Sequence, residues 1–538
     1  MKISRLLFVS LAVALARAAE PAFPFAEATI DDLQARMAAG TLTSRELTAA
    51  YLGRIAQIDK AGPKLNAVIE LNPDALAIAE KLDAERKAGR VRGPLHGIPV
   101  LIKDNIATAD KMETTAGSLA LVGLKPPRDA HLVTRLREAG AVILGKTNPS
   151  EWANFRGERS ISGWSGRGGQ TLNPYALDRS PLGSSSGSAV AVAANLCVVA
   201  IGTETTGSIV SPSSVCGIVG LKPTVGFVSR SGVIPIAASL DTAGPMTRTV
   251  RDAALVLAAL AGFDARDPAT PALPAELAAQ LVAMPAAGAL KGARIGLIRG
   301  GNARPNLDAL LEAAVGAMRA AGAEVIDLGE FPALATIGTA RIDVMLYEMK
   351  VGLNAYLAEL GPEAPMKTLA DLIKFNDEHW AQEQPLFGQQ YFTRAQAKGP
   401  LTEPAYLEAL EKCRRVTRAE GIDALMQEHR LDALVALTTG PAGLITPPAA
   451  GDPVFGPKGP GGSGGAAPAA VAGYPSVTVP MAQVSGLPVG LMFYSRAWSE
   501  VKLLALAADF EAKTHARREP KFFPTVLQGA ETGAVPAK

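Results

Sequence analysis

Cysteine is scarce in this chain of 538 residues, which holds only Cys197, Cys216 and Cys413. An odd number this small does not predict a disulfide framework, even in an oxidising compartment. We expect each cysteine to be a small buried or semi-buried residue. The five histidines are scattered, and no group of cysteines and histidines has the spacing of a zinc site. The sequence therefore predicts no structural or catalytic metal and no cofactor.

An excess of one charge is also lacking, because 53 lysines and arginines face 51 aspartates and glutamates, for a net charge of +2. This balance gives no broad basic field and argues against nucleic acid as a partner. Aromatic residues make up only 5% of the chain, so the core must be built mainly from Ala, Leu, Val and Ile. With 48% hydrophobic and 19% charged residues, the composition excludes a disordered chain.

Long apolar runs are lacking apart from a short one near the N-terminus. Leu6–Ala16 follows Lys2 and Arg5 and precedes small residues around Ala18. The run has 11 residues, whereas a bilayer-spanning helix needs about 20. We therefore favour a secretory signal peptide over a membrane anchor at residues 1–18, with cleavage near Ala18 and Ala19. A periplasmic or secreted location follows, without stable membrane association after cleavage.

Hydrophobic patterning predicts helices first and then an alternation of strands and helices. Ala26–Ala88 is expected to be helical, with one helix beginning at Thr41–Ser44 and running toward Ile58. After Gly97, short apolar runs alternate with helical patterns, which is typical of an α/β layer structure. The expected strands are Ile98–Ile102, Ala141–Leu144, Val198–Ile201, Ala293–Ile298, Ala323–Leu328, Leu431–Ala436 and Ser476–Val479.

Four other segments have a distinct character. Leu307–Ala321 predicts a helix, and Ile342–Ala397 is a polar helical stretch longer than a crossover connection needs. Asp264–Gly292 is rich in Ala and Pro and is expected to be a connection. Gly451–Gly465 is a Gly/Pro-rich loop of the kind that can border a pocket.

The densest chemical signal lies in two Gly/Ser-rich segments. Gly183–Ser188 reads GSSSGS, and Gly202–Val210 reads GTETTGSIV. A loop of this kind entering a helix presents free backbone N–H groups that bind a phosphate or the oxyanion of an acyl intermediate. A phosphate loop would close on Lys followed by Ser or Thr, and Gly183–Ser188 has no lysine. Nucleotide binding is therefore set aside.

Two sources of a nucleophile remain open on the residues alone. Gly183–Gly187 formally matches the nucleophile elbow G-x-S-x-G with Ser185 at its centre, and an α/β-hydrolase would add an acid and a histidine. His379, His429 and His515 lie downstream, none in a supporting motif. Alternatively, Lys103 ends the apolar run that begins at Pro99. If that lysine were buried rather than exposed, its pKa would fall and it could deprotonate a serine.

Taken together, these segments resemble the amidase signature family. The order and spacing agree from His96 to Leu260 most strongly. Supporting motifs are GGQTLNPY from Gly168, GLKPT from Gly220, DTAGPM from Asp241 and GYPSVTVP from Gly473. The resemblance implies an α/β fold, with a large mixed and twisted β-sheet covered by helices on both faces. It implies a single large domain with an extra helical region.

The resemblance also implies a Ser-cisSer-Lys triad. By position, Ser208 matches the nucleophile, Ser184 the bridging serine that follows a cis peptide bond, and Lys103 the general base. The backbone N–H groups of Thr205, Thr206, Gly207 and Ser208 match the oxyanion hole. Ser185 is expected to support this network by hydrogen bonding, and Asp104 and Asn105 are expected to fix the end of the strand.

Four positions depart from the commonest family pattern. Ser186 stands for a glycine, Glu204 for an aspartate, Thr206 for a glycine and Val210 for an arginine. With SGWS from Ser162, LYEMK from Leu346 and LADLI from Leu369, these variants resemble the bacterial peptide amidase branch. That branch removes the C-terminal amide of peptides, which agrees with an exported location. The family's aminoacyl-tRNA amidotransferase role conflicts with export.

The expected function is therefore a serine amidase that hydrolyses a small-molecule or peptide carboxamide through an acyl-enzyme and releases ammonia. One alternative is a broad aryl-acylamide or carbamate hydrolase, with Ile342–Ala397 shaping an apolar pocket. A non-enzymatic alternative is a periplasmic binding protein.

After the signal peptide, we divide the chain into an N-terminal helical region (19–90), a signature core (91–262), an α/β continuation with a helical insertion (263–425), and a C-terminal part of the core (426–538).

Overall fold

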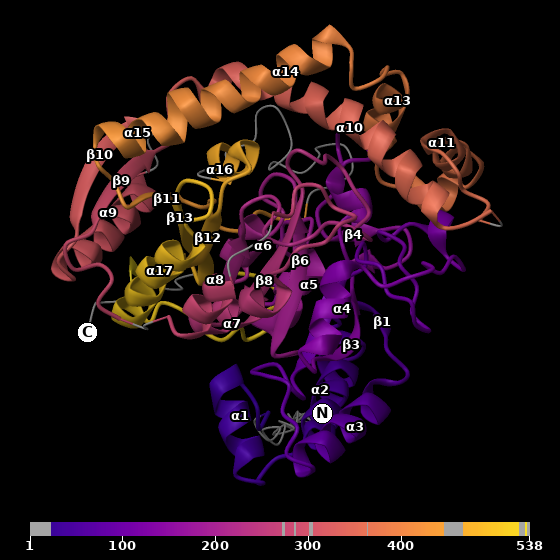
Figure 1. Ribbon diagram of the computed structural model, residues 1–538, viewed down its shortest axis with the longest axis horizontal. Helices are drawn as coiled ribbons and strands as arrows, with labels where there is room; N and C mark the ends of the chain where they lie inside the picture. The colour runs from indigo at the N-terminus through magenta and orange to yellow at the C-terminus, as the bar shows by residue number, and fades with distance from the viewer. Residues whose placement is uncertain are drawn as a thin grey trace, which may run out of the picture.

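The computed structural model describes residues 23–271, 275–284, 287–300, 305–362, 364–445, 466–526 and 533–534. These residues form one large mixed β-sheet with helices packed along it (Figure 1). The α/β fold with a large mixed sheet is therefore confirmed. The predicted signal peptide at residues 1–18 and the segment Gly451–Gly465 lie outside the described residues. The domain boundaries at residues 90, 262 and 425 stay predictions.

The strands of the sheet lie in the order β1-β3-β2-β6-β8-β7-β12-β13-β11-β9-β10, with β14 beside β12. Neighbours β3, β2 and β6 are parallel, β11, β9 and β10 are parallel, and the pairs between these two groups are antiparallel. The strands are β1 (Val68–Leu71), β2 (Pro99–Lys103), β3 (Val142–Thr147), β6 (Val199–Glu204), β7 (Val219–Lys222), β8 (Thr242–Thr247), β9 (Arg294–Arg299), β10 (Glu324–Glu330), β11 (Ala433–Leu437), β12 (Ser476–Val484), β13 (Leu487–Tyr494) and β14 (Gly533–Ala534), and a separate pair is β4 (Trp164–Ser165) with β5 (Gly169–Gln170).

Helices pack around the sheet, and short 3₁₀ or π turns join some of them (Figure 1). The α-helices are α1 (Ile30–Ala38), α2 (Ser44–Arg54), α3 (Ala75–Lys87), α4 (His131–Glu138), α5 (Ser186–Ala193), α6 (Val210–Val215), α7 (Val250–Leu260), α8 (Ala275–Val282), α9 (Pro305–Ala320), α10 (Gly338–Glu359), α11 (Leu369–Glu378), α12 (Trp380–Glu383), α13 (Gln390–Gln396), α14 (Pro404–Arg414), α15 (Asp423–Glu428), α16 (Ala466–Ala472) and α17 (Glu500–Thr514). The turns are η1 (Ile55–Asp59), η2 (Leu119–Leu121), η3 (Glu151–Asn154), η4 (Leu334–Ile337) and η5 (Arg415–Ile422).

The strands β2, β3 and β6 form the buried middle of one half of the sheet. Every residue of the three strands is buried. Parallel strands covered on both faces have nearly continuous apolar sequences, which is why the apolar runs predicted all three. Each strand nevertheless continues past its predicted end, to Lys103, Thr147 and Glu204. Polar and charged side chains are thereby buried where the strands end.

The structure corrects two expectations and adds strands that were not predicted. Val68–Leu71, inside the region expected to be helical, is the edge strand β1, which pairs antiparallel with β3. The connection expected over Asp264–Gly292 contains the helix α8. The sequence of β8 is TAGPMT, which has weak strand propensity. It becomes a strand because β6 and β7 pair with it on either side.

The helical insertion forms an arch along one side of the molecule, drawn in orange tones in Figure 1. Helix α10 packs against α14 and α13, which confirms the helical character predicted for Ile342–Ala397. Aromatic rings join this insertion to the core: Phe155 stacks on Tyr391 with centroids 4.5 Å apart, and Trp152 meets Phe392 edge-on at 5.4 Å. The insertion is thus packed onto the loop that follows β3.

Two further observations concern the described residues. The three cysteines are buried and unpaired, which confirms the expectation for them. None of the helices in the described part of the chain combines the length and apolar character that a bilayer-spanning segment needs.

Candidate active site

Lys103 occupies the end of the buried strand β2 and has no exposed surface. Its Nζ lies 2.7 Å from Ser184 Oγ and 2.9 Å from Thr203 Oγ1, both within hydrogen-bond distance. The neighbouring strand β6 carries Thr203, so the sheet register itself brings this hydroxyl to the lysine. The structure thus joins two of the predicted site residues, Lys103 and Ser184, by a direct hydrogen bond.

Burial changes the protonation of Lys103. Removal of the ammonium group from water lowers the pKa of Lys103 to about 7, against the opposing effect of the carboxylates of Asp241 and Glu204. A substantial fraction of the side chain is therefore neutral near pH 7. A neutral amine can accept a proton from the serine beside it, which an exposed lysine cannot do at this pH.

Ser184 lies in a tightly packed loop before α5. The peptide bond between Gly183 and Ser184 is cis, as the family resemblance implies. Gly183 has no room for a side chain, because a Cβ there would lie 2.3 Å from Ser150 Oγ and 2.8 Å from Ser186 Oγ. Ser186, which stands where the family usually has a glycine, donates to Leu182 O at 2.5 Å and starts α5. The substitution is accommodated by a hydrogen bond within the loop.

Ser208 follows β6 in the turn that leads to α6. The backbone carbonyl of Ser208 accepts a hydrogen bond from Ser185 N at 3.1 Å, which fixes this turn against the serine loop. Ser184 is fully buried, whereas Ser208 retains 4% of its surface exposed. Of the two serines, Ser208 is therefore the one that keeps some exposed surface.

The turn from Thr205 to Ser208 carries four backbone N–H groups, the predicted oxyanion hole. Within the described part of the chain, none of these four groups donates to another protein atom. Gly207 has φ +86°, a conformation that glycine adopts without strain. Donors that are left free beside Ser208 suit an acceptor that arrives with a substrate.

Glu204 precedes this turn and accepts hydrogen bonds from the residues that follow it, a role that the sequence did not reveal. Its Oε2 accepts hydrogen bonds from Ile209 N at 2.7 Å and Val210 N at 3.1 Å. The longer side chain of glutamate, where the family pattern has aspartate, spans the turn from the end of β6. Val210 is fully buried and belongs to an apolar cluster with Ala466 and Ala469 of α16. An apolar contact thus occupies the place of the family's arginine.

Ser185 is held by the backbone of β6. Its Oγ donates to Thr203 O at 3.0 Å and accepts from Thr203 N at 3.1 Å. The side chain of Ser185 thus contacts Thr203, a partner of Lys103, while its backbone N–H donates to Ser208 O. Among the histidines that an α/β-hydrolase would need, His379 contacts Phe375 and His515 lines a different cavity. The arrangement does not favour Ser185 as a nucleophile.

Asp104, Asn105 and Thr203 surround the lysine end of β2. Asp104 Oδ2 accepts from Gly117 N at 3.1 Å and from Thr115 Oγ1, so it fixes the loop after the strand. Asn105 Nδ2 donates to Thr203 Oγ1 at 3.0 Å. Thr203 therefore accepts from both Asn105 and Lys103, and sequence reasoning missed it. Its place one residue before the end of the buried strand β6 was the available signal.

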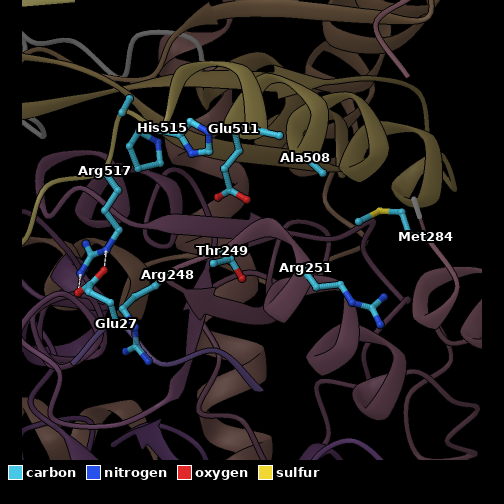
Figure 2. A pocket seen from close by; sticks show the side chains of 12 residues that line it. Glu27, Arg248, Thr249, Arg251, Met284, Ala508, Glu511, His515 and Arg517 are labelled. Carbon is cyan, nitrogen blue, oxygen red and sulfur yellow. Dashed lines mark hydrogen bonds and ion pairs between the residues drawn. The ribbon is translucent and has the colours of Figure 1, made fainter. Parts of the chain in front are cut away.

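A separate cavity of about 400 Å³ lies between α17 and the start of α7 (Figure 2). Its charged lining is already partnered, because Arg517 and Glu27 form an ion pair at 2.6 Å and Glu511 accepts from Val250 N at 3.1 Å. The lining of this cavity does not include the predicted catalytic residues Lys103, Ser184 and Ser208. Across the described residues, no cluster of three or more His, Cys, Asp or Glu side chains is arranged to hold a metal ion.

Comparisons with known proteins agree with this geometry. The model of a family described as Amidase matches residues 46–504. The chain is 41% identical to a probable amidase of Arabidopsis thaliana, over 93% of this chain and 92% of that protein. The native peptide amidase from Stenotrophomonas maltophilia is 55% identical, with a TM-score of 0.86 over 93% of this chain and 99% of that one. A structure of the peptide amidase PAM with the competitive inhibitor chymostatin is 54% identical, with a TM-score of 0.87 over 93% and 100%.

Proposed function

Because the chain belongs to the amidase family, we propose that it hydrolyses a carboxamide through an acyl-enzyme formed on Ser208. The observation that carries this proposal is the 2.7 Å contact between Lys103 Nζ and Ser184 Oγ, at a place without exposed surface. Family membership makes the chain a hydrolase and replaces the alternative of a periplasmic binding protein.

The first half of the reaction forms the acyl-enzyme. Neutral Lys103 takes the hydroxyl proton of Ser184 while Ser184 takes that of Ser208, and Ser208 Oγ attacks the amide carbonyl. The backbone N–H groups of Thr205–Ser208 hold the oxyanion, at about 3–4 kcal/mol per important donor in comparable sites. The proton returns through Ser184 to the amide nitrogen, the C–N bond breaks, and ammonia leaves.

The second half regenerates the enzyme. Water attacks the ester of Ser208 and gives a proton through Ser184 to Lys103. The proton then returns through Ser184 to Ser208 Oγ as the C–O bond breaks, which releases the carboxylic acid and restores both the serine hydroxyl and the neutral lysine. A hydroxyl bridge suits amides because it can deliver a proton to a poor leaving group as the bond breaks. No metal or cofactor takes part in this scheme.

C-terminal peptide amides are the proposed substrates. Support comes from the similarity to peptide amidases over more than nine-tenths of the chain. It comes also from the motifs at Ser162, Leu346 and Leu369 that resemble the same branch. The insertion α10–α15 belongs to this argument, since its aromatic residues pack on the loop beside the site. A broad aryl-acylamide or carbamate hydrolase is the competing assignment.

A periplasmic or secreted location is proposed from the N-terminal sequence. Lys2 and Arg5, the apolar run Leu6–Ala16 and the small residues around Ala18 have the pattern of a cleaved signal. An exported amidase would meet peptides and small amides rather than nucleic acid. N-terminal sequencing of the mature protein should begin near Ala19; a chain that still begins at Met1 contradicts export by this route.

A panel of substrates tests the assignment. N-blocked peptide amides, free peptides, anilides and carbamates are compared by kcat/KM with the purified full chain, with ammonia release measured for the amides. We expect the peptide amides to give the highest kcat/KM and the free peptides to give no cleavage. If anilides or carbamates rank first, the peptide amide assignment is wrong while amide-type hydrolysis stands. If no amide is hydrolysed, the proposed mechanism fails as well.

A further inference from the structure

Asp241 lies in the turn immediately before β8 and uses both carboxylate oxygens. Its Oδ1 accepts from Thr205 Oγ1 at 2.5 Å, and its Oδ2 accepts from Ile236 N and Ala237 N, each at 2.8 Å. Thr205 is the first of the four residues whose N–H groups form the predicted oxyanion hole. Asp241 therefore ties that turn to a loop about 30 residues further along the chain.

Asp241 also lies close to the lysine network, because it lines the same small cavity as Thr203, whose Oγ1 accepts from Lys103 Nζ at 2.9 Å. Of the charges that favour the ammonium form of Lys103, the carboxylate of Asp241 acts most strongly, ahead of Glu204. From the preceding loop Arg230 faces Asp241, but it is engaged by Asp267 through two hydrogen bonds, at 2.5 and 2.9 Å. Among the described residues, Asp241 therefore has no ion-pair partner of its own.

The carboxyl group of Asp241 changes from its protonated to its ionised form close to neutral pH. Burial raises the pKa of Asp241 to about 6, although the hydrogen bonds from Thr205, Ile236 and Ala237 favour the ionised form. Above that pH the carboxylate is ionised next to Lys103, whose pKa is about 7. A small change at either group therefore alters the fraction of neutral lysine.

The helical insertion reaches the same loop. Glu348 of α10 accepts from Ser239 N at 2.8 Å through Oε2 and from Tyr406 OH at 2.7 Å through Oε1. Ser239 lies two residues before Asp241 in the chain. The segment that carries Asp241 is consequently held from one side by the insertion and from the other by the turn after β6.

We propose that Asp241 is a positioning residue for amide hydrolysis, which orients Thr205 in the oxyanion turn and places a negative charge beside Lys103. The inference rests on the function proposed above. It predicts two separable effects, because the hydrogen bond to Thr205 acts on the oxyanion turn whereas the charge acts on the lysine. Removal of the charge disfavours the ammonium form, so the neutral lysine persists to lower pH.

The test is the pH profile of kcat/KM for Asp241→Asn, with a substrate that the unmodified enzyme cleaves. We expect kcat/KM to fall on the order of tenfold to a hundredfold and the acid limb to move to lower pH by about one unit. A purely structural role would not move that limb. A folded variant whose acid limb stays at the original pH overturns the charge assignment.

Two further variants keep the proposal falsifiable if Asp241→Asn does not fold. Thr205→Val should lower kcat with the acid limb unchanged, and Thr205→Ser, which keeps the hydroxyl, should restore most of the kcat. Equal kcat values for the two variants overturn the orienting role.

A matched control separates a local effect from a general one. Asp252 of α7 is another buried acid whose pKa is raised to about 6, and it accepts from Ile30 N at 3.0 Å. Asp252→Asn should leave the acid limb where it is, and an equal shift in this variant contradicts the proposal. If the unmodified enzyme cleaves no amide at all, the proposed function fails. If the unmodified enzyme is active and Asp241→Asn has the same kcat/KM and the same pH profile, only the role inferred for Asp241 fails.

Discussion

At the scale of single residues, the site depends on which buried lysine meets a serine. Lys103, Lys146 and Lys222 are all fully buried, and burial lowers their pKa values to about 7, 8 and 8. Lys146 donates to Ile106 O and Thr114 Oγ1, and Lys222 donates to Pro223 O. Of the three, only Lys103 has a serine hydroxyl among its partners. Burial alone therefore does not identify which lysine is the general base. The hydrogen-bond partner distinguishes the three, because a base must lie within reach of the hydroxyl that it deprotonates.

Replacement of Lys103 should remove the base and its titration together. We expect Lys103→Met to lower kcat by about 10²–10⁴-fold and to abolish the acid limb of the pH profile. In the unmodified enzyme kcat/KM should fall below about pH 7, since protonation of Lys103 removes the proton acceptor. Initial rates between pH 5 and about 9 measure both effects.

The matched control for this prediction is Lys146→Met, in the neighbouring strand β3. Lys146 is equally buried, but its hydrogen bonds are to Ile106 and Thr114 rather than to a serine. The acid limb should stay at its original pH in this variant, even where stability falls. The assignment of the base is wrong if Lys103→Met keeps both its activity and its acid limb.

At the scale of elements, close backbone packing fixes where the serine loop enters α5. Gly187 lies in the first turn of α5, and a Cβ there would be 2.2 Å from Ala67 O and 2.6 Å from Asn148 N. Its own N–H donates to Asn148 O at 2.9 Å. The first turn of the helix is therefore pressed against the backbone at the ends of β1 and β3. That contact sets the position of the serines that precede it.

Gly187→Ala should destabilise the protein, because backbone atoms cannot move aside as a flexible side chain would. We expect a loss of about 3 kcal/mol, at the upper end of overpacking costs, together with reduced kcat from a displaced serine loop. Thermal and urea unfolding midpoints measure the stability change.

Gly53→Ala in α2 is the control for a helical glycine with free space. Apart from its chain neighbours and the backbone of its own helix, no atom of the described residues lies within 4 Å of a Cβ at that position. The variant should be unchanged or more stable by about 0.5–1 kcal/mol, since alanine is the better helix former. Equal behaviour of the two variants would show that contact at Gly187 does not limit stability.

At the scale of the whole molecule, a buried ion cluster fastens the helical insertion to the core. Arg156 Nη1 lies 2.6 Å from Glu151 Oε1 and 3.5 Å from Glu383 Oε2, and all three side chains are fully buried. Glu383 ends α12, and its Oε1 accepts from Leu119 N at 2.6 Å. Burial raises the pKa of Glu151 well above its usual range. The guanidinium of Arg156 thus pairs with the carboxyl groups of both Glu151 and Glu383, which come from different parts of the chain.

Arg156→Ala should loosen the insertion, because it leaves two buried carboxyl groups without a cation. Loss of one partner of a buried pair costs about 3–5 kcal/mol. Limited proteolysis of the insertion and the thermal unfolding midpoint report the effect. The control is Arg394→Ala, which breaks an exposed ion pair with Glu158 between α13 and the same loop. It should cost no more than about 1 kcal/mol; similar losses in the two variants would contradict the role given to burial.

The sequence by itself determined the chemistry and much of the framework. Continuous apolar runs identified β2, β3 and β6, because strands buried on both faces need them. The motifs around Lys103, Ser184 and Ser208 identified the family and supplied the residue types that the proposed reaction needs. The order of these motifs along the chain was enough to propose a lysine base and a serine relay.

Only the tertiary structure decided what surrounds these residues. Thr203 accepts from Lys103 because β6 pairs with β2. Asp241 reaches Thr205 because β6 pairs antiparallel with β8, where Glu204 lies opposite Thr242. The strands β1 and β8 likewise exist through pairing with their neighbours rather than through propensity. Local patterns encode burial and chain direction, whereas the pKa of a lysine depends on the solvent it loses and the charges that long-range folding brings near it.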